Sequence, residues 1–400
     1  MITKLHIDGF KSLVNFDVSF TKGINVLIGP NGVGKTNVCQ ALSIVASMPN
    51  NELKDILNQL GGANSVFHKG KHKKEKLLAI AAEGEVQFKL KQKEKEEAYS
   101  INYAYKINIK LQKNGILLVN ESLHVSRKKE DNEYIPILEV THNKGTLSYK
   151  ILNNEFLGDF KIPQNRLKLK LDSDDNLWCL MPKISVVCHA IGRDLFRIKS
   201  INIDPNIARQ ACDIVDPNKM LGNGKFLSNA LYALSKQKGR LDEINSIMEQ
   251  SLPCCIKIKP EISQLTMKRY FTLVDNDKNV FSSNSLSDGT IKLLGLLVGV
   301  INQDKYTMII EEPENYLHPN VHRMLIDYLR ETFDDGACIL TSHSETILNL
   351  MNPEELIICQ LEDNLTKCKR IDDIESVKVA ISESGFGCGY HYVSGGLSGL

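Results

Sequence analysis

The octapeptide GPNGVGKT, residues 29–36, has residue types and spacing suited to holding phosphate groups. It matches the pattern G-x-x-x-x-G-K-[ST], in which glycines let backbone N–H groups curl round phosphates without Cβ clashes. Lys35 would reach the β- and γ-phosphates of ATP, and Thr36 would ligate Mg²⁺. The cradle itself is expected to comprise Gly29, Pro30, Asn31, Gly32, Val33 and Gly34. An apolar segment precedes this loop and a helical pattern follows it, as such a site requires.

Two adjacent carboxylates follow the apolar segment YTMII. Ligands and catalysis in open α/β sheets gather at the carboxyl ends of strands. One carboxylate there can hold Mg²⁺, and the next can orient and deprotonate the water that attacks a γ-phosphate. We assign Glu311 to the metal and Glu312 to the water; the alternative is a solvated acidic turn.

The segment ACILTSHSETIL places His343 just beyond a second strand. An imidazole there can donate a hydrogen bond to the γ-phosphate or to the attacking water. A lone His is also a common structural residue, so this catalytic role depends on the neighbouring acidic strand end. His318 precedes Pro319 at an expected helix start, where capping or packing is favoured over chemistry.

The cluster Ser287, Asp288, Gly289 and Thr290 opens a long apolar run. Ser and Asp cap helices by accepting hydrogen bonds from free backbone N–H groups, so simple capping explains the cluster when it is taken alone. The order of the other motifs supplies a second interpretation, given below.

The elements that must position these residues alternate between strand and helix, which predicts a mostly parallel sheet covered by helices. We therefore expect an α/β fold. Residues 1–56 would carry the phosphate loop, 57–200 a β-rich insertion or arm, and 201–280 a helical lobe with connecting strands. Residues 281–400 would complete the core with the polar cluster, the carboxylates and His343.

The net charge and composition of the chain limit the classes of function that it can have. The net charge of +1 gives no global attraction to nucleic acid, so such binding would rest on basic stretches such as 68–76 and 166–172. Solvated loops are the favoured explanation of those stretches, since no interleaved aromatic residues suggest base stacking. No secretory signal or membrane span is evident, and the ten scattered cysteines read as reduced core thiols, so we expect a cytoplasmic protein. The Gly-rich tail 385–400 is compatible with a flexible tail or a docking segment, and its two tyrosines favour packing.

The order of phosphate loop, Ser-Asp-Gly, two carboxylates and His resembles ABC-type ATPase heads of the SMC and RecF kind. It looks most like the OLD-like branch of bacterial AAA ATPases. The resemblance is carried by FKSL (10–13), GPNGVGKT (29–36), LSDGT (286–290), EEPENYLHP (311–319) and TSHS (341–344), with weaker echoes in NESL (120–123), GKFLSNAL (224–231) and GYHYVSGGL (389–397). It implies a P-loop NTPase of the ABC/SMC-head type.

In those families the Ser-Asp-Gly cluster completes the ATP site of a second copy. The resemblance implies that Ser287, Asp288 and Gly289 contact the nucleotide held by a partner's loop, so that two heads, or a higher even number, close round ATP. Asp288-Gly289-Thr290 differs from the Gly-Gly-Gln of transporter heads, which argues against a transporter. A glutamine loop cannot be placed, and the chain is too short after residue 372 for a Toprim nuclease, so we expect none; the acidic residues at 373–375 are interpreted as a solvated turn.

Three functions are compatible with these motifs. The first is a Mg²⁺-dependent ATPase whose ATP-gated dimer controls a separately encoded nuclease or toxin in bacterial anti-phage defence. The second is a RecF- or SMC-like ATPase that binds DNA in repair or maintenance. The third is a scaffold that uses ATP only to hold a dimer, and the carboxylate pair Glu311-Glu312 argues against it.

Overall fold

A computed structural model describes most of the 400 residues. The described residues are 1–48, 51, 53–70, 76–92, 95–112, 115, 117–128, 133–143, 145–153, 169–170, 177–179, 186–252, 255–301 and 307–396. They form two compact units, each built from several stretches of the chain. The first comprises Met1–Lys22, Gly29–Ile198 and Ile357–Lys369, and the second comprises Gly23–Ile28, Lys199–Leu356 and Arg370–Leu400.

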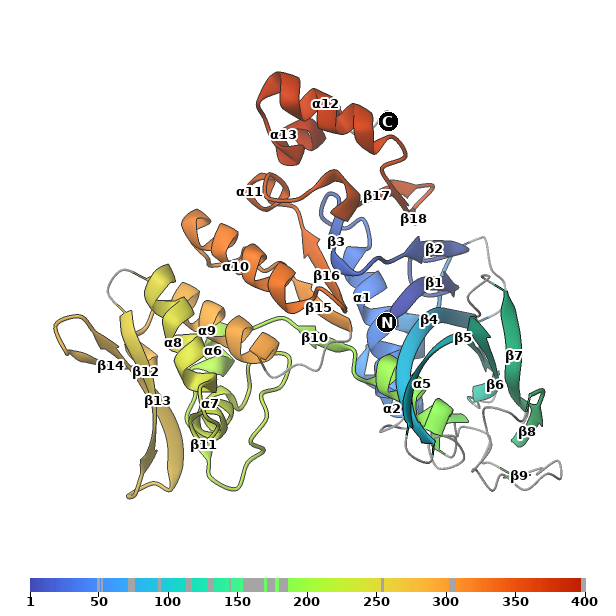
Figure 1. Ribbon diagram of the computed structural model, residues 1–400, viewed down its shortest axis with the longest axis horizontal. Helices are drawn as coiled ribbons and strands as arrows, with labels where there is room; N and C mark the ends of the chain where they lie inside the picture. The colour runs from blue at the N-terminus through green and yellow to red at the C-terminus, as the bar shows by residue number, and fades with distance from the viewer. Residues whose placement is uncertain are drawn as a thin grey trace. The chain divides into compact units, whose positions relative to one another are not determined.

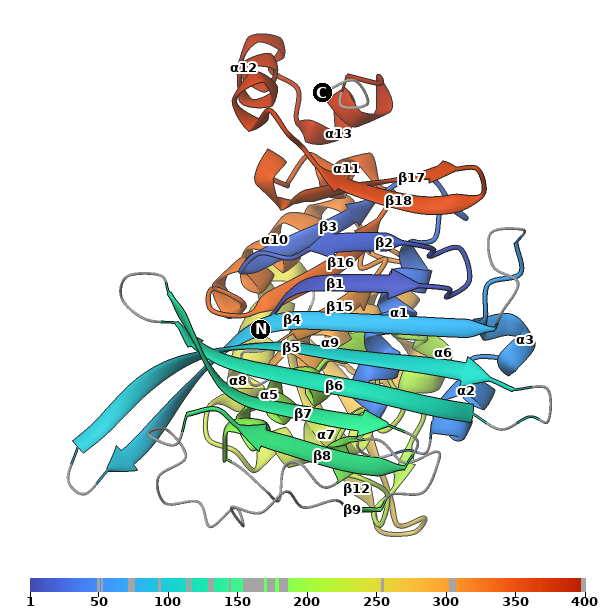
Figure 2. The ribbon, with the colours of Figure 1, turned by 90° about the vertical axis from the view of Figure 1, so that its right-hand side faces the viewer.

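The first unit contains an eight-stranded antiparallel sheet (Figure 2). Its strands alternate in burial, as a sheet with one covered face requires. Strand β4 pairs with β1, so the strands after residue 76 extend the sheet that the N-terminal strands begin. Across the sheet the strands are β2 (Phe16–Ser19), β1 (Ile2–Asp8), β4 (Leu77–Gln92), β5 (Lys95–Leu111), β6 (Leu117–Lys128), β7 (Tyr134–Asn143), β8 (Thr146–Ile151) and β9 (Leu169–Lys170).

The segment NESL has a structural role in this sheet. Glu121 lies on the buried side of β6 and accepts hydrogen bonds from the Tyr105 hydroxyl (2.6 Å) and the Leu177 N–H (2.7 Å). The second of its oxygens also lies 3.0 Å from His142 Nδ1. A buried carboxylate needs such partners, and here they tie four elements of the first unit together, β5, β6, β7 and the short helix at Leu177.

Short helices and two further strands complete the first unit. Helix α1 follows the phosphate loop and buries Val38, Leu42 and Val45, which are spaced as one helical face, and it contacts α5. The remaining elements are α1 (Lys35–Ser47), α2 (Leu53–Gln59), α3 (Ala63–Val66), η1 (Leu177–Cys179), α5 (Val186–Phe196), β17 (Leu356–Glu362) and β18 (Leu365–Arg370).

The second unit contains a parallel sheet with the strand order β10 (Lys199–Ile201), β15 (Thr307–Glu311), β16 (Ala337–Ser342) and β3 (Gly23–Ile28). Every residue of β16 is buried, which is typical of a strand covered on both faces. Helices α9 (Asp288–Ile301) and α10 (Pro319–Thr332) precede and follow β15 (Figure 1). The predicted alternation of strands and helices after residue 285 is confirmed.

The rest of the second unit is a small antiparallel sheet with helices against it, and a C-terminal helical segment. Its elements are α6 (Pro205–Ala208), β11 (Cys212–Asp213), α7 (Leu227–Ser235), α8 (Arg240–Ser251), β12 (Cys255–Ser263), β13 (Lys268–Asp275), β14 (Val280–Ser282), η2 (Ser283–Ser285), α11 (Glu345–Leu348), η3 (Pro353–Glu355), α12 (Ile374–Ser384) and α13 (Cys388–Val393). Helix α13 packs against α11, as expected for the tail, while residues 397–400 lie outside the described part.

Most of the two basic stretches also lies outside the described residues, which omit 71–75, 166–168 and 171–172. His68, at the start of the first stretch, uses Nδ1 to donate to the Lys11 carbonyl at 2.6 Å. That side chain is therefore engaged in the fold. Among the described helices, none is long and apolar enough to cross a membrane.

Candidate functional site

The glycines of the phosphate loop are required by close contacts as well as by backbone conformation. A Cβ on Gly29 would lie 2.5 Å from the Cys359 carbonyl oxygen, and one on Gly34 would lie 2.1 Å from Thr366 Oγ1. Gly34 also has φ +102°, which favours glycine, whereas a Cβ on Gly32 would meet nothing within 4 Å. The loop is thus packed on one side and open at Gly32.

Lys35 lies inside the curve of this loop. Its ammonium donates to the carbonyl oxygens of Gly29 (2.6 Å) and Pro30 (3.1 Å), and the residue is only 6% exposed. These two hydrogen bonds hold the positively charged Lys35 ammonium against the backbone of the phosphate loop. The sequence-predicted contact of Lys35 with phosphates would need the ammonium to turn from, or to share, these carbonyls.

A chain of hydrogen bonds between side chains supports the phosphate loop. Asn37 Nδ2 donates to Ser12 Oγ (2.8 Å), Ser12 Oγ lies 2.6 Å from Thr366 Oγ1, and Thr366 donates to the Val33 carbonyl (2.7 Å). Since the Thr366 proton points to Val33, Ser12 is the donor to Thr366. Ser12 belongs to the FKSL segment noted in the sequence, whereas Thr366 was missed because nothing local marks it.

Glu312 stands directly after β15 in a strained backbone conformation with φ +44°. Its N–H is held by the Thr341 carbonyl (3.1 Å) and lies 3.2 Å from Thr341 Oγ1. Asn315 Nδ2 donates to Glu312 Oε2 at 2.7 Å, which orients the carboxylate. Glu311, the last residue of β15, pairs in register with Thr341 of β16.

His343 and Glu312 are brought together at this edge of the parallel sheet. Nδ1 of His343 lies 3.8 Å from Glu312 Oε1, and the two side chains are 43% and 38% exposed. Both groups are therefore near each other and accessible to water, as a base and its neighbour must be. His318, by contrast, caps α10 through a bond from the Asn320 N–H (3.3 Å), which confirms the structural interpretation.

The Ser287 cluster begins α9 as a helix cap. Ser287 Oγ accepts from the Thr290 N–H at 3.2 Å, which confirms the capping prediction. Arg209 organises the segment before it by donating to the carbonyls of Ser283, Asn284 and Leu286 and by pairing with the Asp288 carboxylate. Sequence reasoning missed Arg209, which lies 79 positions before Asp288.

Within the first unit, the phosphate loop and the start of α1 suit the phosphates of a nucleotide. Gly34, the N-cap of α1, has no side chain to cover the start of this 13-residue helix, and a helix N-terminus is suited to an anion. A hydroxyl such as that of Thr36 in the first unit and a carboxylate such as that of Glu311 in the second are each hard oxygen groups of the kind that Mg²⁺ takes as ligands. Among the described residues no cluster of three or more His, Cys, Asp or Glu could hold a metal by itself.

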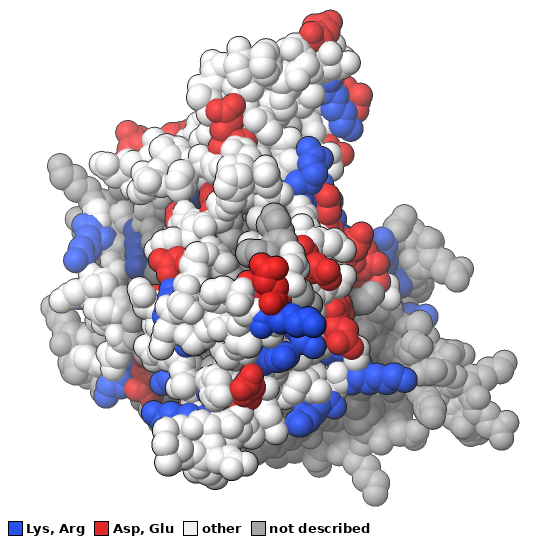
Figure 3. All heavy atoms as spheres, turned by 90° about the vertical axis from the view of Figure 1, so that its left-hand side faces the viewer, with Lys and Arg blue, Asp and Glu red and all other residues white. Residues whose placement is uncertain are grey.

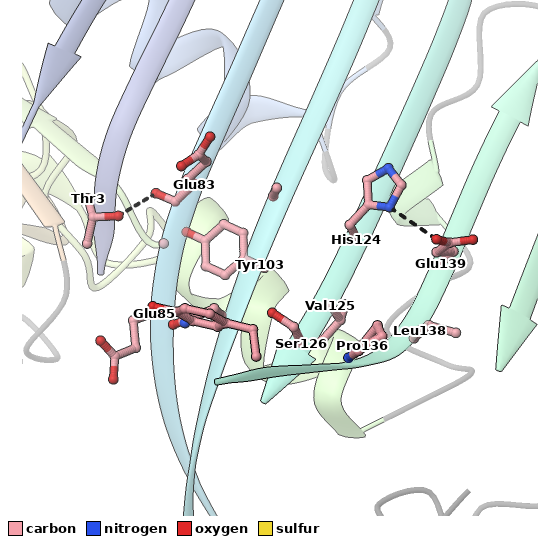
Figure 4. A pocket seen from close by; sticks show the side chains of 14 residues that line it. Thr3, Glu83, Glu85, Tyr103, His124, Val125, Ser126, Pro136, Leu138 and Glu139 are labelled. Carbon is pink, nitrogen blue, oxygen red and sulfur yellow. Dashed lines mark hydrogen bonds and ion pairs between the residues drawn. The ribbon is translucent and has the colours of Figure 1, made fainter. Parts of the chain in front are cut away.

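A separate cavity of about 440 Å³ opens on the sheet of the first unit (Figure 4). Glu83, Glu85 and Glu139 line it, and His124 faces Glu139 across neighbouring strands at 3.8 Å. The described residues around it include no Lys or Arg, so this cavity is unsuited to phosphate.

Figure 3 shows a face on which Lys and Arg side chains lie interspersed with Asp and Glu. A continuous basic stripe is the usual footprint of a nucleic-acid surface. The described residues of this face do not form one.

Comparisons with known proteins agree with this geometry. A family profile described as "AAA domain, putative AbiEii toxin, Type IV TA system" matches residues 24–349. The chain is also 43% identical over 44 residues to the "DNA double-strand break repair Rad50 ATPase" of Methanopyrus kandleri, a match that covers 11% of this chain and 5% of that protein.

Two solved structures are similar over nearly the whole chain. One is the SmcHead bound to the C-winged helix domain of ScpA, with a TM-score of 0.50, 13% identity, and 92% and 97% of the two chains covered. The other is an Smc head with an extended coiled coil bound to the C-terminal domain of ScpA, derived from Pyrococcus furiosus, with a TM-score of 0.49, 12% identity, and 96% and 98% covered. The first similarity confirms the predicted fold class, a P-loop NTPase of the ABC/SMC type.

Proposed function

Because the chain belongs to the AAA-domain family whose profile spans residues 24–349, we propose that it hydrolyses ATP with Mg²⁺ as an ATP-gated pair of copies that controls a separately encoded partner. Family and fold together support an ATPase of the ABC/SMC type. The observation that carries hydrolysis, beyond binding, is Glu312, held at the end of β15 by Thr341 and Asn315 with His343 beside it.

Each candidate residue has one role in this proposal. The loop amides and Lys35 bind the phosphates, while Thr36 and Glu311 hold Mg²⁺, which supplies charge neutralisation at the phosphates. Glu312 orients a water molecule and accepts its proton at the carboxylate, and Asn315 keeps that carboxylate from rotating. His343 donates a hydrogen bond to the γ-phosphate or to the same water.

Pairing is proposed from the cluster at the start of α9. Ser287 and Asp288 are exposed, and Gly289 brings backbone close to the Tyr316 carbonyl in the same chain, where a Cβ would lie at 2.5 Å. A helix start with an exposed hydroxyl is suited to a phosphate held by another copy. The higher even-numbered assemblies expected from the sequence would repeat this contact.

A place in a toxin system is proposed from the family description, "AAA domain, putative AbiEii toxin, Type IV TA system", whose words apply to the AAA domain itself; the separately encoded partner is our addition to it. On this proposal the ATP-bound pair presents a surface to the partner, and hydrolysis of the ATP removes that surface. The nucleotide state therefore switches a nuclease or toxin. Cellular anti-phage defence is the setting that suits such a switch.

Phosphate release by the purified chain tests the proposal. We expect release per chain to rise with protein concentration, since each site needs two copies, and to stop when EDTA removes Mg²⁺. Activity per chain that is independent of concentration would contradict pairing, and activity in EDTA would contradict the metal assignment. Strong stimulation by DNA that vanishes with rising salt would instead favour direct action on nucleic acid.

A further inference from the structure

Two cysteines face each other across a hairpin that contacts the phosphate loop. Strands β17 and β18 are neighbours in a sheet and are joined by Asp363 and Asn364 alone (Figure 2). These two residues have φ values of +49° and +63°, as a two-residue type I′ turn requires. Because a two-residue turn fixes the register of its strands, Cys359 lies directly opposite Cys368.

The register also brings the two side chains close together. Opposed residues of an antiparallel pair alternate between hydrogen-bonded and non-hydrogen-bonded positions, counted here from the hydrogen-bonded pair that flanks the turn. Cys359 and Cys368 fall at a non-hydrogen-bonded position, where the Cα atoms lie about 4.5 Å apart. Thr366, which has the same parity as Cys368, agrees with this count, since its N–H donates to the Ser12 carbonyl (3.0 Å) outside the hairpin. A disulfide spans Cα separations of about 4.4–6.8 Å, so this pair can form one.

The two thiols differ in exposure. Both are free in the structure, but Cys359 is buried whereas Cys368 is partly exposed. A hydrogen bond with the Cys368 side chain, and then burial, raise the pKa of the Cys359 thiol well above its ordinary value, and the positive charge of Lys35 opposes that shift. Since the thiolate is the form that reacts with oxidants, Cys368 would react first and Cys359 would close the bridge.

The hairpin contacts the phosphate loop from both of its strands. The Cys359 carbonyl oxygen would lie 2.5 Å from a Cβ on Gly29, so this strand has no room to move toward the loop. Thr366, two positions before Cys368 and therefore on the same face of β18, donates to the Val33 carbonyl (2.7 Å). The commonest Cα separation in disulfides is about 5.5–6 Å, wider than at a non-hydrogen-bonded position, so closing the bridge must shift at least one strand.

We propose that Cys359 and Cys368 form a disulfide on exposure to hydrogen peroxide, and that this bridge displaces the phosphate loop and weakens nucleotide binding. The Cys368 thiolate attacks one peroxide oxygen, which breaks the O–O bond, releases hydroxide and leaves a sulfenic acid. The Cys359 sulfur loses its proton and attacks the Cys368 sulfur, and a second hydroxide leaves. Two thiols and one hydrogen peroxide thus become one disulfide and two water molecules. Only the weakened nucleotide binding rests on the proposed function.

The test treats the full chain with hydrogen peroxide and then with dithiothreitol. Trypsin cuts after Lys367, between the two cysteines, so tandem mass spectrometry of the unreduced digest should show Cys359 joined to Cys368. We expect amide hydrogen exchange of a peptide spanning 29–36 to become about tenfold faster in the oxidised chain. The Kd for a fluorescent ATP analogue should rise about tenfold, as for the loss of about one hydrogen bond, and dithiothreitol should reverse both changes.

Cys368→Ser should bind the analogue as the untreated chain does and should not respond to peroxide. Cys338→Ala removes a buried cysteine of β16 instead and should keep the full response. If Cys368→Ser does not fold, Cys359→Ala supplies the same comparison.

Free thiols at both positions after peroxide would overturn the proposal. So would a peroxide effect that persists in Cys368→Ser, or a bridge that leaves either exchange at 29–36 or the affinity for the analogue unchanged. Failure of the untreated chain to bind nucleotide would refute the proposed function, while the linkage and the exchange at 29–36 would still decide whether the bridge forms and displaces the loop.

Discussion

Glu312→Gln is expected to lower kcat for ATP by about 10²- to 10⁴-fold, the contribution typical of a positioned general base. The amide cannot accept the proton of the attacking water, but its oxygen can still accept the hydrogen bond from Asn315 Nδ2. The loop after β15 should therefore keep its shape, and nucleotide affinity should change little. Single-turnover phosphate release and nucleotide titration measure the two quantities separately.

A suitable control is Glu331→Gln, an exposed carboxylate on α10 that takes no part in the site. It should leave kcat within about twofold of wild type, as surface substitutions usually do. Unchanged turnover in Glu312→Gln would refute the assignment of the base. Loss of nucleotide binding in that variant would mean that Glu312 acts on the nucleotide or metal.

Gly34→Ala is expected to weaken nucleotide binding about 10²-fold. The added Cβ would lie 2.1 Å from Thr366 Oγ1 and 2.8 Å from Ser12 Oγ, so the loop or the hydroxyl chain behind it must move. Overpacking of this kind costs about 1–3 kcal/mol, and the left-handed conformation at φ +102° adds strain for alanine. Equilibrium titration with a fluorescent ATP analogue measures the effect.

Gly239→Ala is the control that separates the effect of a Cβ collision from the effect of a left-handed backbone conformation. Gly239 is also a left-handed glycine at the N-cap of a helix, with φ +78°, but a Cβ there meets nothing within 4 Å. It should lower stability by about 1–2 kcal/mol, the cost of a left-handed backbone for a residue with a Cβ, and leave nucleotide affinity unchanged. Equal affinities of Gly34→Ala and wild type would contradict the requirement for a bare backbone at Gly34.

The elements that carry the site could be predicted because their patterns are local. The apolar segments before Gly29, Glu312 and His343 became strands β3, β15 and β16, and Pro319 begins α10 as its position indicated. Parallel strands end at one edge, so the proximity of Glu312 and His343 followed from topology. In the region 57–200, the alternation of polar and apolar residues predicted strands. It could not show that β4 pairs with β1, because antiparallel pairing leaves no local signature in the sequence.

The residues that hold the site in place, Thr366 and Arg209, could not be predicted from local patterns. Thr366 contacts the loop residue Val33 from 333 positions away, and Arg209 contacts Asp288 from 79 positions away. Polar side chains of this kind look like ordinary surface residues until the fold buries them.

The central claim is that one chain supplies only part of each ATP site and that Ser287 completes the site of another copy. Sedimentation velocity of Glu312→Gln with ATP and Mg²⁺ tests it most directly, because blocked hydrolysis should preserve the ATP-bound pair. We predict a doubling of mass with ATP but not with ADP, and no doubling when Ser287→Arg, which still binds ATP, is added to the same chain. An ATP-bound Glu312→Gln that keeps its nucleotide-free mass, or a Ser287→Arg chain that still doubles, would contradict the account.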